Sequence, residues 1–114
     1  MSELTTKGTW IVDPAKEGDF VEAWATFAAW ASALPGSTML RLARDEANER
    51  RFVSFAVWES PEAVRAWKSG PEFKERMAQV LQHVDEFLPE ELLVVARGEQ
   101  GTKTIELTAA NRPA

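Results

Sequence analysis

The stretch RFVSFAVW at residues 51–58 decides the fold of this chain. Successive side chains of a β-strand point to opposite sides, so a strand with one face in water alternates apolar and polar residues. Here both sides are apolar: one carries Phe52, Ala56 and Trp58, and the other carries Val53, Phe55 and Val57. We therefore expect a strand whose two faces are both covered.

The residues before this stretch predict a strand, a long helix and a hairpin partner. Residues 9–12 form a short apolar strand that ends at Asp13-Pro14, because proline lacks an N–H and favours an extended residue before it. Residues 16–34 then follow the spacing of one helical face. That face carries Phe20, Trp24, Phe27, Ala31 and Leu34. Residues 38–44 form a second strand, which a polar loop joins to residues 51–58.

The residues after it predict two helices and a last strand. Ser60-Pro61-Glu62 is typical of a helix start, with serine as the N-cap, proline at the first helical position and an acid in the first turn. This helix covers residues 63–69, and Gly70-Pro71 separates it from a second helix that runs from residue 72 to about residue 86. Pro89 ends that segment. The apolar residues 92–96 predict a strand within residues 91–97.

The resulting order is β-α-β-β-α-β, an α+β fold of the ferredoxin-like type with an antiparallel four-stranded sheet. Its helices cover one sheet face only. Because no further element is left to cover the other apolar face, we expect a second copy of the chain there, forming an obligate homodimer through the sheet faces. We expect one domain over residues 1–97 and a tail over residues 98–114. An extra strand at residues 104–108 is expected to pair with an edge strand, either of the same chain or of the partner subunit.

Composition narrows the function classes. The chain has 114 residues, a net charge of −5, no cysteine and one histidine. The negative charge argues against nucleic acid and anionic membranes as partners, and no apolar run is long enough for a membrane span. The missing cysteines and the single histidine exclude thiolate and multi-histidine metal sites. No phosphate-binding loop for a flavin or nicotinamide is present. We expect a cytoplasmic protein without metal or cofactor, since no export signal is present.

Four segments together resemble the antibiotic biosynthesis monooxygenase (ABM) domain of the dimeric α+β barrel superfamily. They are FVEAW at 20–24, RFVSFAVWES at 51–60, EAVRAW at 62–67 and PEF at 71–73. The resemblance runs from about residue 9 to residue 97. It implies the ferredoxin-like fold and its assembly into a dimeric α+β barrel.

The resemblance also implies three chemistries. The first is cofactor-free oxygenation of phenolic, anthrone-like polyketides, in which the ionised substrate itself reduces dioxygen in a dry aromatic pocket. The second, haem degradation, uses a first-strand asparagine, a tryptophan at the position of Trp67 and a histidine on the last helix. Residues 8–12 lack asparagine and Met77 replaces the histidine, so we reject it. The third is isomerisation or removal of small reactive metabolites. Some quinone-forming members use a tyrosine, which this chain lacks.

The aromatic residues supply candidate substrate-binding positions. Trp67 either anchors the core or forms a wall that stacks on a planar substrate. Trp30 lies about 80° from the centre of its helix's apolar face on ideal geometry, so it lines a cavity or covers the dimer edge. The candidate set is Trp24, Trp30, Phe55, Trp67, Phe73 and Met77. Sequence alone leaves open whether they surround a cavity or fill a solid core.

Two residues are candidates for catalysis. His83, which borders the apolar face of the last helix, is either the proton acceptor for an acidic phenol or a partly exposed histidine near Asp85 and Arg76. Arg41 either extends to the sheet rim or pairs with a substrate phenolate. We therefore expect a cofactor-independent monooxygenase acting on a planar phenolic or polyketide-like aromatic; the alternative is a non-catalytic dimeric protein that binds a hydrophobic aromatic small molecule.

Overall fold

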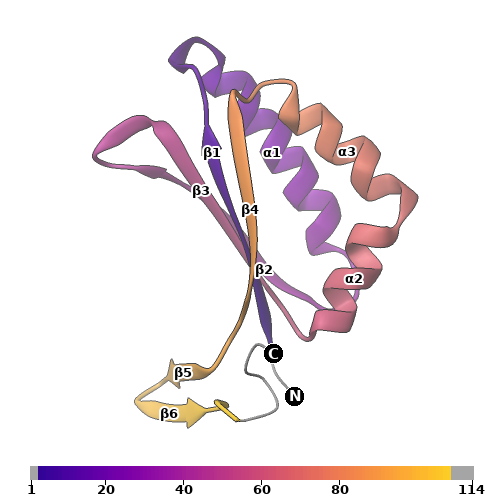
Figure 1. Ribbon diagram of the computed structural model, residues 1–114, viewed down its shortest axis with the longest axis vertical. Helices are drawn as coiled ribbons and strands as arrows, with labels where there is room; N and C mark the ends of the chain where they lie inside the picture. Colours follow the sequence, from indigo (N-terminus) through magenta and orange to yellow (C-terminus); the bar gives the residue numbers. More distant parts are fainter. Residues whose placement is uncertain (1–2, 109–114) are drawn as a thin grey trace.

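The computed structural model describes residues 3–108, which form an antiparallel sheet with helices on one of its faces (Figure 1). In chain order the elements are β1 (Leu4–Ile11), the 3-10 turn η1 (Pro14–Lys16), α1 (Glu17–Ser32), β2 (Ser37–Asp45), β3 (Asn48–Trp58), α2 (Pro61–Ser69), α3 (Pro71–Leu81), β4 (Glu86–Leu93), β5 (Ala96–Glu99) and β6 (Thr102–Ile105). The main sheet has the order β2-β3-β1-β4, and each neighbouring pair is antiparallel. The predicted ferredoxin-like α+β fold is confirmed.

The helix boundaries follow from local chemistry. The Ser60 hydroxyl accepts a hydrogen bond from the Ala63 backbone N–H at 3.2 Å, as predicted for an N-cap. Gly36, between α1 and β2, has a φ of +86°, and a Cβ there would lie 2.6 Å from the Ala63 Cβ. Glycine therefore allows both the left-handed turn and the close approach of α2. Within residues 3–108, no helix is long and apolar enough to cross a membrane.

The core lies between α1 and the inner face of the sheet. The predicted apolar face of α1 is buried through Phe20, Trp24, Phe27 and Ala31. It packs against the even-numbered residues of β3, of which Phe52, Ala56 and Trp58 are buried. The Phe20 and Phe52 rings meet edge to face with their centroids 5.1 Å apart.

The last strand corrects the sequence prediction. Helix α3 ends at Leu81 and not near residue 86, and β4 runs over Glu86–Leu93 and not within residues 91–97. Pro89 lies inside β4, opposite Gly8 of β1. Proline lacks the N–H of a ladder hydrogen bond, but an edge strand tolerates this on its unpaired side, and β4 is an edge strand. Contrary to the sequence prediction, Pro89 therefore continues a strand and does not end the segment.

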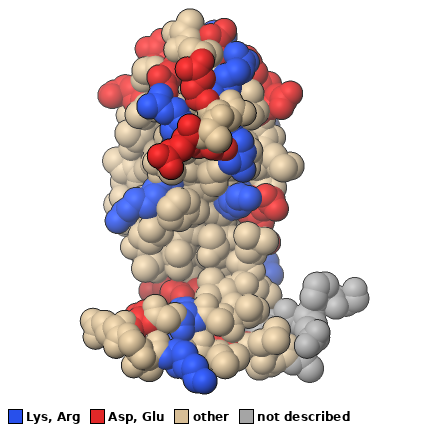
Figure 2. Space-filling view, turned by 90° about the vertical axis from the view of Figure 1, so that its left-hand side faces the viewer, with Lys and Arg blue, Asp and Glu red and all other residues tan. Residues whose placement is uncertain are grey.

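The outer face of the sheet is apolar and open in the single chain. The exposed fractions of Phe55, Leu88 and Leu92 on this face are 37%, 59% and 47%. Figure 2 looks onto this side and shows an uncharged area over the lower half of the sheet, with most of the charged side chains above it and others on the hairpin below. Both faces of β3 are thus apolar, as predicted, and the second copy that would cover the outer one stays a prediction.

The chain continues from β4 into a small hairpin beyond the foot of the sheet (Figure 1). The strand expected at residues 104–108 is β6, which begins earlier and pairs with β5 of the same chain and not with an edge of the main sheet. Arg97 connects this hairpin to the start of β1 through Glu3, at 3.5 Å between Nη1 and Oε1. Residues 109–114 of the predicted tail lie outside the described part of the chain.

Candidate ligand site

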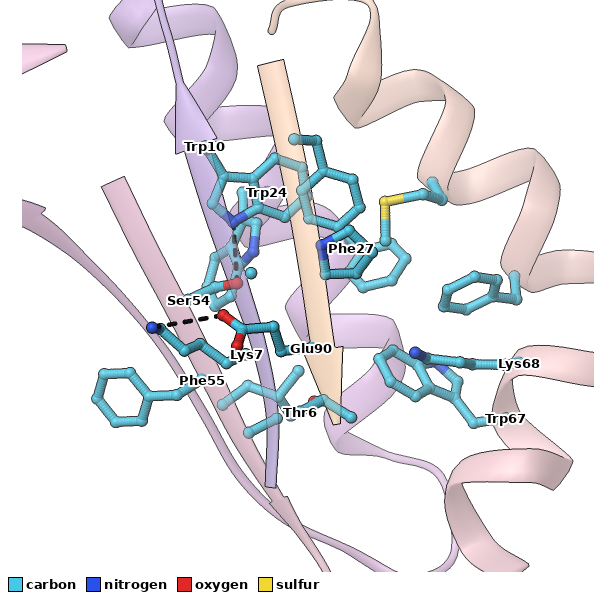
Figure 3. Close-up of a pocket in the computed structure, with 17 residues that line it drawn as sticks. Thr6, Lys7, Trp10, Trp24, Phe27, Ser54, Phe55, Trp67, Lys68 and Glu90 are labelled. Atoms are coloured by element: carbon cyan, nitrogen blue, oxygen red, sulfur yellow. Dashed lines mark hydrogen bonds and ion pairs between the residues drawn. The ribbon is translucent and has the colours of Figure 1, made fainter. Parts of the chain in front are cut away.

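A cavity of about 180 Å³ lies between the inner face of the sheet and the three α-helices (Figure 3). β1, β3 and β4 supply most of its floor, and all three helices contribute to its opposite wall. The apolar residues that line it are Trp10, Trp24, Phe27, Leu40, Phe55, Ala56, Trp67, Phe73, Met77, Phe87 and Pro89. A lining of this kind suits an aromatic ligand.

Trp67 is the centre of the helix-side wall. Its ring is stacked on Trp58 with centroids 4.5 Å apart and planes 26° apart. Phe73 of α3 meets it edge-on at 5.0 Å, and Phe27 of α1 lies 5.9 Å away. The side chain is only 8% exposed. Contacts with three rings from three elements hold the indole in one orientation.

A glycine allows the floor to pack closely. The Trp10 indole N–H donates to the Ser54 hydroxyl at 2.9 Å, and the Trp10 ring is stacked on Phe87 at 4.0 Å. A Cβ on Gly8 would lie 2.8 Å from the Ser54 oxygen and 2.9 Å from both Phe87 Cε1 and Trp10 Nε1. Gly8 therefore marks a close approach of side chains across the strands, which is a common reason for glycine in a strand.

Charge at the cavity occurs in ion pairs. Lys7 and Glu90 are 3.5 Å apart and project from the outer face of the sheet, as their register places them beside Phe55. On the helix side, the Lys68 Nζ of α2 reaches Glu91 Oε2 of β4 at 2.7 Å. Lys68 is itself a lining residue. This second pair spans the side of the cavity where β4 faces α2.

The structure brings most of the predicted substrate-binding residues to this cavity. Trp24, Trp67, Phe73 and Met77 line it together. Phe55 also borders it, but Figure 3 shows its ring directed away from Trp67, in agreement with its place on the outer sheet face. Trp30 is not among the lining residues. It packs edge-on against Phe27 at 5.6 Å, and the Arg76 guanidinium lies 4.9 Å from its ring centre.

The two predicted catalytic residues do not line the cavity. His83 is half-buried in the turn between α3 and β4, where its backbone N–H donates to the Val80 carbonyl at 3.1 Å. Arg41 is exposed on β2, and its guanidinium donates to the Leu40 carbonyl at 2.9 Å. Arg41 instead borders a more open hollow of about 340 Å³ beside α1 and β2.

Sequence reasoning missed several residues of the site, namely Trp10, Phe27, Ser54, Lys68 and Phe87. Two of them, Phe27 and Trp10, had a usable signal. Phe27 belongs to the apolar face of α1, and Trp10 lies two residues after Gly8, a glycine that indicates close packing in a strand. Lys68 had none, since its partner lies 23 residues away on a strand whose position was predicted wrongly. Within residues 3–108, no group of three or more His, Cys, Asp or Glu residues is placed to hold a metal ion.

Comparison with known proteins identifies relatives of this chain. The family model described as "Antibiotic biosynthesis monooxygenase" matches residues 7–79. Among curated proteins, none matches the chain significantly. Among solved structures, SnoaB from Streptomyces nogalater, named as a cofactor-independent oxygenase, superposes with a TM-score of 0.72 at 24% identity, over 90% of this chain and 100% of SnoaB.

Two further structures share the fold. A Caulobacter crescentus CB15 protein, proposed to be an antibiotic biosynthesis monooxygenase, has a TM-score of 0.72 at 22% identity, over 80% of this chain and 88% of its own. A conserved protein from Methanosarcina mazei Go1 has a TM-score of 0.71 at 14% identity, over 82% and 92% of the two chains. At these identities the likeness concerns the fold.

Proposed function

The chain belongs to the antibiotic biosynthesis monooxygenase family, and from this premise we propose that it is a cofactor-independent monooxygenase acting on a planar phenolic aromatic. The observation that carries the proposal is the aromatic cavity between sheet and helices. Its walls offer flat faces to a flat molecule, and its polar lining atoms are few. The name of SnoaB as a cofactor-independent oxygenase supports the same chemistry for a chain of this fold.

The size of the cavity limits the substrate. An apolar cavity of about 150 Å³ is known to accept benzene. The cavity of about 180 Å³ therefore suits one or two fused rings of a planar molecule. A tricyclic substrate such as an anthrone would extend beyond it, toward the side where β4 faces α2.

The proposed reaction needs electrons from the substrate alone. An anthrone-like phenol loses a proton, and the resulting carbanion or phenolate transfers electron density to dioxygen. One oxygen atom becomes the new carbonyl of the ring, the ring CH₂ loses both hydrogens, and the second oxygen atom leaves as water. The protein contributes orientation and exclusion of bulk water, which raise the rate without a redox group.

We propose that Trp24, Trp67, Phe73 and Met77 contact the substrate rings. Trp30 and Phe55, which the sequence also predicts to bind substrate, would contact it only at the edges of the site. His83 as proton acceptor and Arg41 as anion stabiliser stay predictions, and both would need the substrate to extend beyond the cavity described above.

The test is dioxygen consumption by metal-free protein with a model anthrone, using an oxygen electrode and following quinone formation by absorbance. We expect oxygen uptake and quinone in a ratio of one to one, above the rate in buffer. The matched reference is the same protein with the corresponding anthraquinone, which has the same three fused rings but no CH₂ to oxidise. Uptake no faster than in buffer would remove the monooxygenase proposal.

A specific observation favours a second candidate, a non-catalytic protein that binds an aromatic small molecule. The charged lining residues Lys7, Lys68 and Glu90 all have ion-pair partners, and the predicted base His83 is not a lining residue. Saturable binding of the anthraquinone without oxygen uptake from the anthrone would select this candidate.

We also propose that a second copy covers the outer sheet face, forming a homodimer. The support is the exposure of Phe55, Leu88 and Leu92 on one face, which is unusual for large apolar side chains of a monomer. Sedimentation should give twice the 12.7 kDa chain mass at micromolar concentration. A monomer under those conditions would contradict the proposal.

A further inference from the structure

The side of the cavity between α2 and β4 carries an ion pair that the proposed function does not use. Lys68 follows Trp67 on α2, and its side chain runs past the Trp67 ring toward β4 (Figure 3). Its Nζ lies 2.7 Å from Glu91 Oε2. The ammonium thus stands beside the aromatic wall, at the edge of an otherwise apolar cavity.

Lys68 differs from the other cation at the cavity. Lys7 projects to the outer face of the sheet with Glu90, so its charge lies on the far side from the aromatic walls. Of the lining residues in the described part of the chain, Lys68 is therefore the cation on the helix side. The whole chain carries a net charge of −5, so an anion approaching the cavity meets repulsion that only a local cation offsets.

The existing partner of Lys68 is replaceable. The Lys68 and Glu91 side chains are 30% and 49% exposed, and ion pairs at that exposure are weak because water screens them. An ammonium has three donors, so it can hold Glu91 and a second oxygen together, or exchange one for the other.

We propose that Lys68 binds an anionic oxygen of the ligand, a carboxylate or an ionised phenol, while the ligand ring occupies the aromatic cavity. The preferred ligands are acidic aromatics. This inference rests on the proposed function, because it takes the ring to lie in the cavity, and it adds the charge of the substrate and the residue that selects it. Glu91 opposes the same ligand by competing for Lys68.

The experiment measures dissociation constants by calorimetry for two pairs of probes, in a mildly alkaline buffer in which 4-nitrophenol is ionised and lysine is still protonated. 2-Naphthoate and 2-naphthamide differ in a carboxylate charge, whereas 4-nitrophenolate and 4-nitroanisole differ in a phenolate charge. The variants are Lys68→Gln, Lys68→Arg and Glu91→Gln. The control is Arg65→Gln, which removes the same charge from the same helix at a side chain that is 74% exposed and outside the cavity lining.

We expect Lys68→Gln to weaken the binding of the anionic probes roughly tenfold, as for loss of a hydrogen bond to a charged group. The affinity for the neutral probes should not change. Lys68→Arg should retain most of the preference, and Arg65→Gln should retain all of it. Glu91→Gln should raise the affinity for the anionic probes, since it frees Lys68. Added salt should weaken the anionic probes in the wild type but not in Lys68→Gln.

The outcomes separate this inference from the proposed function. If no probe binds, the aromatic site itself is refuted. If all probes bind and Lys68→Gln changes the affinity for the charged and neutral probes alike, the aromatic site is supported and the role of Lys68 is overturned. If the preference for the anionic probe depends on Lys68 in just one of the two probe pairs, the inference is supported, and that pair identifies the anion as carboxylate or phenolate.

Discussion

Truncation of Trp67 is expected to separate a ligand-binding role from a packing role. Trp67 is 8% exposed and contacts the rings of Trp58, Phe27 and Phe73. Replacing a buried tryptophan by alanine costs about 3–5 kcal/mol. We place Trp67→Ala in the upper part of that range, because three ring contacts are lost together. For a chain of this length, at about 4 °C per kcal/mol, a loss in the upper part of the range lowers the melting temperature by roughly 16–20 °C.

A second variant calibrates the loss of stability. Phe20 is fully buried, meets the Phe52 ring edge to face and does not line the cavity. Phe20→Ala should therefore destabilise the chain by a similar ~3–5 kcal/mol without removing a cavity wall. Trp67→Phe keeps an aromatic wall and removes an indole N–H that is buried without a hydrogen-bond partner in the described part of the chain. It should lose less stability than Trp67→Ala.

The assay is anthrone-dependent oxygen uptake per folded protein, measured well below both melting temperatures, with the folded fraction determined by circular dichroism. We expect Trp67→Ala to lose roughly tenfold in rate, corresponding to the upper value for one aromatic contact. The rate of Phe20→Ala should stay near that of the wild type. The rate of Trp67→Phe should lie between those of the wild type and Trp67→Ala. Equal losses in Trp67→Ala and Phe20→Ala would refute the reasoning, because Trp67 would then act only through packing.

Three further changes test the surrounding structure. Gly8→Ala forces a Cβ to 2.8 Å from the Ser54 hydroxyl, so we expect a loss of about 1–3 kcal/mol in urea unfolding. Ser60→Ala removes the N-cap of α2 and should cost about 1 kcal/mol by the same measurement. The Ala47 backbone N–H donates a hydrogen bond that lowers the pKa of Asp45. The ionised Asp45 therefore stabilises the fold above the ordinary carboxyl pKa, and this contribution is lost as pH falls through the lowered pKa. The midpoint difference between wild type and Asp45→Asn should therefore be present at neutral pH and disappear in acid; a difference that persists in acid contradicts this.

Much of the fold could be predicted because its signals are local. The apolar spacing of α1 and the serine-proline start of α2 are each contained within a few residues. β4 could not be placed, because its identity depends on pairing with β1. The apolar run at residues 92–96 resembles a strand more than Glu86–Leu93 does, yet the ladder to β1 uses the latter. Pro89 is acceptable there only because β4 is at the sheet edge, which is a tertiary property.

The candidate site divides in the same way. Trp24 and Phe73 could be assigned from helical spacing, since residues on the inner faces of α1 and α3 must meet the sheet. The cavity itself could not be predicted, because it depends on how far helices and sheet approach one another. The Lys68–Glu91 pair was equally hidden, as it connects two elements through the register of β4.

The unfilled space has a cost in stability, which supports the proposal that the cavity binds a ligand. At about 24 cal/mol per Å³ of cavity, 180 Å³ corresponds to roughly 4 kcal/mol as an upper bound, since water has access to the edge of the space. That is a large part of the ~5–15 kcal/mol that stabilises a typical domain. Ala56 and Gly8 are both small residues on the floor, and a larger side chain at Ala56 would fill part of the space. Six aromatic side chains of the inner face and the helices nevertheless surround a space that none of them fills: Trp10, Trp24, Phe27, Trp67, Phe73 and Phe87. A planar ligand that occupies it would recover the missing contacts, so binding and stability should rise together.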